Sequence, residues 1–221
     1  MKVLPEFRLA RVALLLVGLA ALCLFALPAG LAQAAGTHPE FSRSTHAAAG
    51  LTCTSCHLPP ADGGDKGLLK DKQITLCETC HAQVPEAFAL ASHHPVAEGK
   101  VQCSDCHNVH AAALPSGPAA TAARNQSCIK CHAEAGGPFK FEHPAVKAQG
   151  CTACHEPHGS KNAKLLIRAN VNQICMFCHT MATNFTAPGV PQFHNQSKNP
   201  QPCTSCHAEV HGSNTSKIFL K

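Results

Sequence analysis

The sequence of 221 residues contains no tryptophan and no tyrosine, so ten phenylalanines supply all of its large aromatic side chains. Past residue 34 it also lacks any apolar run near the roughly 20 residues that a membrane-spanning helix needs. The first absence indicates that something other than large aromatic side chains fills the interior. The second excludes a helical membrane span from residues 35–221.

Cysteine and histidine are abundant instead, with 15 and 16 copies. Fourteen cysteines form seven Cys-x-x-Cys pairs, and a histidine follows each pair directly. This is the attachment sequence of c-type haem, in which two thiols bond to the porphyrin and the histidine binds iron. We therefore predict seven covalent haems. Their covalent residues are Cys53, Cys56, Cys77, Cys80, Cys103, Cys106, Cys128, Cys131, Cys151, Cys154, Cys175, Cys178, Cys203 and Cys206, and their proximal ligands are His57, His81, His107, His132, His155, His179 and His207.

Zinc sites and disulfides are the alternative interpretations of so many cysteines. Paired Cys-x-x-Cys sequences build tetrahedral zinc sites, and an exported chain with an even cysteine count fits a disulfide framework. Neither needs a histidine directly after every pair. Thioredoxin-like redox chemistry needs one such pair and not seven, so haem attachment is the interpretation we favour.

The N-terminus has the composition of an export signal. Basic residues (Lys2, Arg8 and Arg11) precede an apolar run over residues 12–27 and a small-x-small site at 32–34. We expect a signal peptide over 1–34, cleavage after Ala34 and a periplasmic location, with outer-membrane association or an extracellular location as variants.

The basic charge balance does not indicate a nucleic-acid partner. The formal net charge of the sequence is +5 at pH 7, and removal of residues 1–34 leaves +3. Seven haems add fourteen propionates, so lysines and arginines are needed as their counter-charges. We expect no nucleic acid among the partners.

The expected fold class follows from the small share of chain available to each haem. Residues 35–221 provide about 27 residues per haem, too few for an ordinary protein core. We expect a single heptahaem domain over 35–221 that is mostly irregular with short α-helices. It should be an elongated multihaem cytochrome c wrapped on a chain of haems, with little or no β structure.

The motifs repeat with two periods. Successive motifs start 23 to 28 residues apart, and alternate motifs start about 50 residues apart. The longer period predicts a two-haem repeat used about three times, followed by a final haem. We expect helices within 68–82, 82–90 and 162–181, and a linker over 111–123, which is rich in Ala, Pro and Gly.

Nine histidines lie outside the motifs, and seven of them occupy repeated positions. Four lie seven to nine residues before a cysteine pair, and three lie three or four residues after a motif histidine. One such residue is available for the second axial position of each iron: His46, His94, His143 and His194 upstream, and His110, His158 and His211 trailing. His38 and His93 are left as propionate partners or surface groups, although His93 is also placed to replace His94 and His38 to serve the first haem.

The alternation of upstream and trailing histidines along the chain suggests which histidine binds which haem. We expect each upstream histidine to bind the haem attached directly after it, which assigns His46, His94, His143 and His194 to the first, third, fifth and seventh. The trailing histidines then serve the second, fourth and sixth haems. No haem follows His211, so trailing histidines cannot all bind forward.

The doubled arrangement resembles a known family. His-Pro, then Gly, then Cys-x-x-Cys-His-x-x-His-Gly, followed by a plain Cys-x-x-Cys-His, is similar to the doubled-motif multihaem cytochromes c over residues 41–213. That family includes periplasmic decahaem conduit cytochromes and the pentahaem donor to nitrite reductase. The resemblance implies haems with two histidine ligands arranged as an electron wire, here with seven motifs.

Electron transfer is the function that this pattern favours. Two histidines fill both axial positions of an iron, which leaves no position for a substrate. We expect redox partner proteins: a membrane quinol dehydrogenase or another cytochrome as donor, and a reductase or outer-membrane conduit as acceptor. The alternatives are a nitrite- or hydroxylamine-converting reductase with one open haem, and a subunit of a cytochrome filament. Such reductases commonly carry a motif with Lys in place of His, and none of the seven motifs is altered in that way.

Overall fold

The structure is a computed structural model that describes residues 40–59, 67–114, 116–179 and 201–221. All of these residues belong to one unit, residues 38–221. The expected signal peptide and the histidines His38 and His194 lie outside the described residues.

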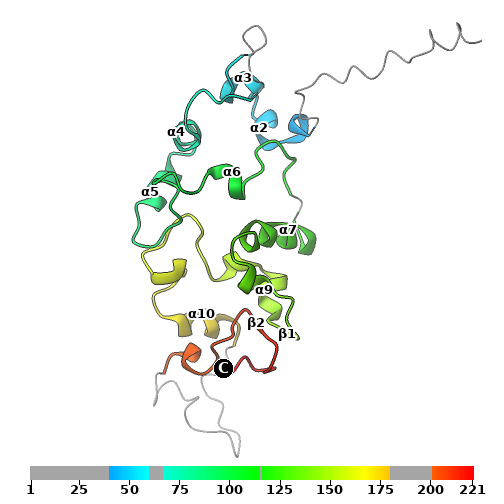
Figure 1. Ribbon diagram of the computed structural model, residues 1–221, viewed down its shortest axis with the longest axis vertical. Helices are drawn as coiled ribbons and strands as arrows, with labels where there is room; N and C mark the ends of the chain where they lie inside the picture. The colour runs from blue at the N-terminus through cyan, green and yellow to red at the C-terminus, as the bar shows by residue number, and fades with distance from the viewer. Residues whose placement is uncertain (1–39, 60–66, 115, 180–200) are drawn as a thin grey trace, which may run out of the picture. The chain divides into compact units, whose positions relative to one another are not determined.

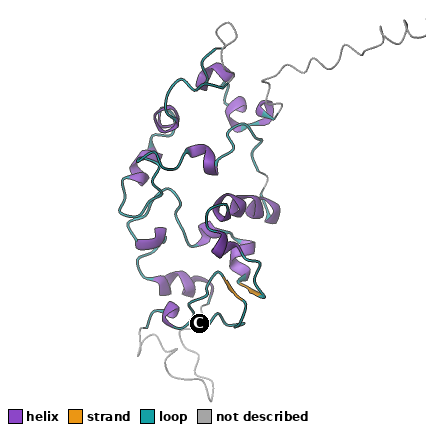
Figure 2. Ribbon diagram, in the orientation of Figure 1, coloured by secondary structure: helices purple, strands orange, loops and turns teal. Residues whose placement is uncertain are grey.

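Short helices joined by loops make up nearly all of the described chain (Figures 1 and 2). Within the described ranges, only β1 (Phe141–Glu142) and β2 (Gly212–Ser213) form strands, and these two pair antiparallel. The α-helices are α2 (Thr45–Ala48), α3 (Cys53–Cys56), α4 (Gln73–Glu78), α5 (Gln83–Phe88), α6 (Cys103–Cys106), α7 (Pro118–Ile129), α8 (Ala133–Gly136), α9 (Pro144–Ala148) and α10 (Val171–Cys178). The 3-10 helices are η1 (Phe41–Arg43), η2 (Cys151–Ala153), η3 (Ala163–Leu165) and η6 (Cys203–Ser205). The expected class, irregular with short helices and little β, is confirmed.

Two expected boundaries were wrong. The supposed linker over 111–123 contains the start of α7, the longest helix described. Pro118 occupies its first turn, where a missing N–H costs nothing, and the following alanines favour helix. The helix expected over 162–181 is shorter: η3 and α10 are separate, and α10 begins after Asn170, whose side chain accepts from the N–H of Asn172.

Every haem-attachment motif adopts the same helical turn. In all seven, the histidine N–H donates to the carbonyl oxygen of the first cysteine at 2.8 to 3.1 Å. One such turn puts positions i, i+3 and i+4 on one face. Both thiols and the imidazole of each motif therefore point to the same side, as attachment of one porphyrin requires.

Three short antiparallel crossings recur along the chain. They pair Ser44 with Ala112, Ser92 with Ser160, and Phe141 with Ser213. In each crossing the first residue lies two positions before an upstream histidine and the second lies two positions after a trailing histidine. The crossings thus bring together histidines that are more than 60 residues apart in sequence.

Few apolar side chains are buried in the protein itself. Among the described residues the buried apolar side chains are Phe88, Val96 and Ala120. Ser44, Ser160 and Ser213, one from each crossing, are buried as well. The protein atoms therefore form only a small core, as expected of a chain whose haems supply the remaining apolar surface.

Candidate functional site

Imidazole rings meet in pairs throughout the described part of the chain. Each pair joins one motif histidine to one histidine outside the motifs, with ring centres 5.9 to 6.3 Å apart. The six pairs are His57–His110, His81–His46, His107–His158, His132–His94, His155–His211 and His179–His143.

The spacing within these pairs fits a metal ion bound between the two rings. An imidazole nitrogen binds a first-row metal at about 2.0 to 2.1 Å, and the ring centre lies about 1.1 Å behind it, so two rings on opposite sides have centres about 6.3 Å apart. Within the described ranges no cluster of three or more metal-ligating side chains is present. Two imidazoles are what an iron takes from protein when a porphyrin supplies its other four ligands. The donor set therefore fits haem.

The six outer histidines of these pairs were all named from sequence, but the expected pairing was wrong in every one. His46 lies against His81 of the second motif and not against His57 of the first, and His110 lies against His57. The same exchange occurs in the next two repeats. The reason is the crossing: the trailing histidine of one repeat returns to the first motif of the preceding repeat, and the upstream histidine reaches the second motif of its own repeat.

Hydrogen bonds across these crossings orient the upstream histidines. His46, His94 and His143 donate through Nδ1 to the carbonyl oxygens of Val109, Pro157 and Val210, at 3.3, 2.7 and 2.8 Å. Each acceptor directly precedes a trailing histidine. The bond fixes the tautomer, so that Nε2 is the nitrogen left to bind iron.

A second set of bonds orients three proximal histidines. His57, His155 and His207 donate through Nδ1 to the carbonyl oxygens of Gly67, Lys164 and Ile218, at 3.1, 2.8 and 2.6 Å. These acceptors lie 9 to 11 residues after the histidine, on a segment that turns back toward its motif. Here too the backbone leaves Nε2 for the metal.

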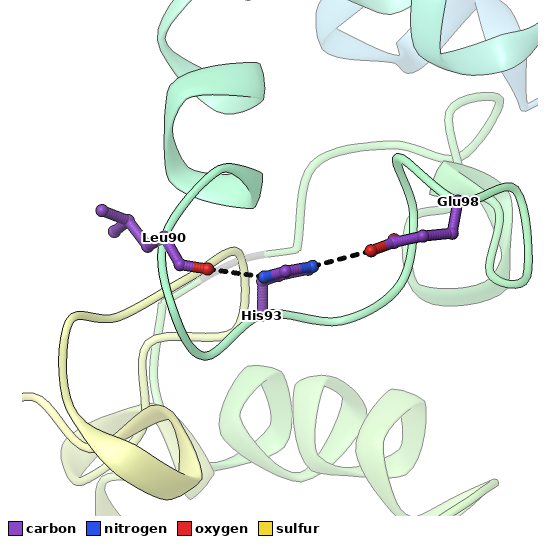
Figure 3. Close-up of polar contacts among 3 residues, drawn as sticks. All are labelled: Leu90, His93 and Glu98. Carbon is purple, nitrogen blue, oxygen red and sulfur yellow. Dashed lines mark hydrogen bonds and ion pairs between the residues drawn. The ribbon is translucent and has the colours of Figure 1, made fainter.

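His93 is occupied by other partners (Figure 3). Its Nδ1 donates to the carbonyl oxygen of Leu90 at 2.6 Å, and its Nε2 donates to Oε1 of Glu98 at 3.0 Å. The bond to Glu98, followed by the bond to Leu90, raises the pKa of His93, while His93 lowers the pKa of Glu98. Both ring nitrogens are thus engaged, which favours His94 as the iron ligand.

Cysteines of consecutive motifs lie next to one another. Cys77, Cys128 and Cys175 lie within hydrogen-bonding reach of Cys103, Cys151 and Cys203, each in the following motif. The remaining junctions are close enough for their thiols to interact electrostatically: Cys56 with Cys77, Cys106 with Cys128, and Cys154 with Cys178. The attachment points therefore follow one another in space in the order of the sequence.

A family comparison agrees with this arrangement. The sequence model of the doubled CXXCH motif family matches residues 46–86, 93–137 and 143–184, more than half of the chain. The chain belongs to the doubled-CXXCH multihaem cytochromes c. Each match covers two Cys-x-x-Cys-His motifs, which agrees with the attachment of c-type haem.

A curated relative extends the comparison. The chain is 34% identical over 182 residues to the "Multiheme cytochrome MtrA" of Shewanella baltica (strain OS185), an alignment that covers 79% of this chain and 54% of the relative. The chain thus spans about half the length of the relative it matches.

The exchanged pairing is testable by counting haems that bind carbon monoxide. In a variant in which Cys53→Ala and Cys56→Ala remove the first haem, we expect His110→Ala to add no such haem, since its iron is already gone. His46→Ala in the same background should add one, because it opens the second haem. If instead His110→Ala adds one and His46→Ala adds none, the pairing expected from sequence holds.

Proposed function

We propose that this chain is an exported electron-transfer protein that binds seven c-type haems, each between two imidazoles, and connects a donor protein to an acceptor protein. The observation that carries the proposal is the set of six imidazole pairs at 5.9 to 6.3 Å. When bound, such haems supply reversible one-electron chemistry.

The protein's own residues determine what this chemistry is used for. The two imidazoles of each pair would hold the iron between them, and they would thereby exclude substrates and oxygen from the metal. The cysteine contacts between consecutive motifs hold the carriers in sequence order, which favours transfer along the chain over transfer at isolated centres. His194, outside the described residues, is the ligand we propose for the seventh motif, where His207 already donates through Nδ1 to Ile218.

The partners we propose are proteins. A membrane quinol dehydrogenase or another cytochrome serves as donor, and a reductase or outer-membrane conduit serves as acceptor. Support for a periplasmic location comes from the signal-like residues 1–34 and from the likeness to a multihaem cytochrome. Among the described helices, none has the length and apolar character that crossing a bilayer requires.

A reductase with an open haem is the competing function, and the described geometry does not favour it. For the first haem the sequence left His38 as a second candidate ligand. In the structure, the rings of His57 and His110 lie nearly parallel, 24° apart, with centres at 6.0 Å. The first six motif histidines all have such a partner.

Intact mass and spectroscopy test the proposal together. We expect the purified, exported protein to carry seven covalent haems by mass, to show low-spin absorption in both oxidation states, and to bind no carbon monoxide when reduced. A mass corresponding to fewer haems would refute the count. High-spin absorption or stoichiometric carbon monoxide binding in the native protein would instead support the reductase.

A further inference from the structure

The iron sites differ in the hydrogen bonds that their imidazoles make. At six of the seven motifs, one imidazole donates through Nδ1 to a backbone carbonyl: the proximal ring at the first, fifth and seventh, and the outer ring at the second, fourth and sixth. The third site, formed by His107 and His158, is the exception. In the part of the chain that the structure describes, neither of these two rings hydrogen-bonds to any residue.

The path of the chain after the third motif explains the exception. After the first, fifth and seventh motifs the chain turns back and bonds to its own motif segment: Leu58 N–H to Leu68, Glu156 N–H to Leu165, and Glu209 N–H to Phe219. After the third motif, Ala112 pairs with Ser44, and the chain then enters α7 at Pro118. The interval that elsewhere brings a carbonyl back to the imidazole is here the start of a helix.

An apolar side chain also covers one ring of the third site. The Phe88 ring, only 6% exposed, meets the ring of His158 edge-on, with centres 5.6 Å apart and planes at 74°. Phenylalanines also meet the outer rings of the first and sixth sites, Phe41 at His110 and Phe219 at His143. At those two sites, however, one imidazole donates to a backbone carbonyl. The third site alone combines the apolar cover with two rings that lack an acceptor.

The missing hydrogen bonds and the phenylalanine cover both destabilise the oxidised iron, so both raise its reduction potential. A hydrogen bond from Nδ1 to an acceptor makes the imidazole a stronger donor and stabilises the oxidised, more positive iron. Apolar surroundings disfavour that extra positive charge. We propose that His107 and His158 give their haem iron the highest reduction potential in the chain, so that the third position is where an electron from the donor protein rests. This inference rests on the proposed function.

Substitution of the apolar cover tests the inference. The test is a spectroelectrochemical titration of the intact protein. We expect Phe88→Gln to lower the reduction potential of the highest-potential haem by at least about 59 mV, which is a tenfold change in its ratio of reduced to oxidised haem for one electron. The lower components should stay in place. Ala89→Gln is the matched control, since it puts the same side chain on the exposed neighbouring residue, and it should leave every component unchanged. A shift confined to a lower component, or none at all, would overturn the assignment.

Nuclear magnetic resonance provides a second measurement that does not depend on Phe88. The haem methyl signals lost in His158→Met identify the third haem, and those lost in His211→Met identify the fifth. In the unsubstituted protein we expect the third-haem signals to be the first to reach their reduced positions as reductant is added. Third-haem signals that move with or after those of the fifth would refute the inference. The proposed function would fail separately, through haems that are missing or high-spin.

Discussion

We expect His94→Ala to open one haem per chain to carbon monoxide, and His93→Ala to open none. The rings of His94 and His132 have centres 6.2 Å apart, and Nδ1 of His94 donates to the carbonyl oxygen of Pro157 at 2.7 Å. In the proposed arrangement, the truncation would therefore remove one of the two imidazole ligands of the fourth haem. The variant should show high-spin absorption from about one seventh of its haem, and titration of the reduced protein should give one bound carbon monoxide per chain.

His93→Ala is the matched control, because His93 directly precedes His94 in the sequence and is also a histidine. His93 is engaged at both ring nitrogens by Leu90 and Glu98, so its removal takes no ligand from iron. His93→Ala should therefore keep all haems low-spin, with only a local effect on the loop. If His93→Ala opened a haem and His94→Ala did not, the two residues would have to exchange roles.

Gly159→Ala should destabilise the protein and disturb the third site. A Cβ added to Gly159 would lie 1.8 Å from the carbonyl oxygen of Ala87, which is backbone of α5 and cannot move aside cheaply. Gly159 also lies between His158 and Ser160. The N–H of Ser160 donates to the carbonyl oxygen of Ser92 at 2.8 Å, and the carbonyl oxygen of Ser160 accepts from the N–H of Ser92 at 3.0 Å. We expect a cost of about 3 kcal/mol, seen as a fall of roughly 10 °C in the melting temperature.

Gly99→Ala is the control that distinguishes the steric clash at Gly159 from the effect of adding a methyl group to any glycine. Gly99 has a φ of +71° and no atom within 4 Å of an added Cβ, so Gly99→Ala meets only the backbone penalty of about 1 to 2 kcal/mol. Its melting temperature should fall less, and its third haem should stay low-spin. If the melting temperatures of the two variants fell equally, the close contact between Gly159 and α5 would contribute nothing to stability.

The local chemistry could be predicted from sequence because it depends on short spacings. Cysteines at i and i+3 and a histidine at i+4 share one face of a single turn, whatever the rest of the chain does. All seven motifs form that turn, and the family match agrees with c-type haem. The fold class followed from the same count, since so short a chain with so many attachment sites has no room for an ordinary core.

The sequence by itself thus determined the attachment chemistry, the class of fold and the set of histidines available as second ligands, whose role remains a prediction. Only the tertiary structure decided which histidine meets which motif. His46 is seven residues before one motif and 31 before the next, and nearness in sequence favoured the wrong one. The crossings at Ser44, Ser92 and Phe141 reverse that preference, because a ligand's reach depends on where antiparallel segments more than 60 residues apart come together.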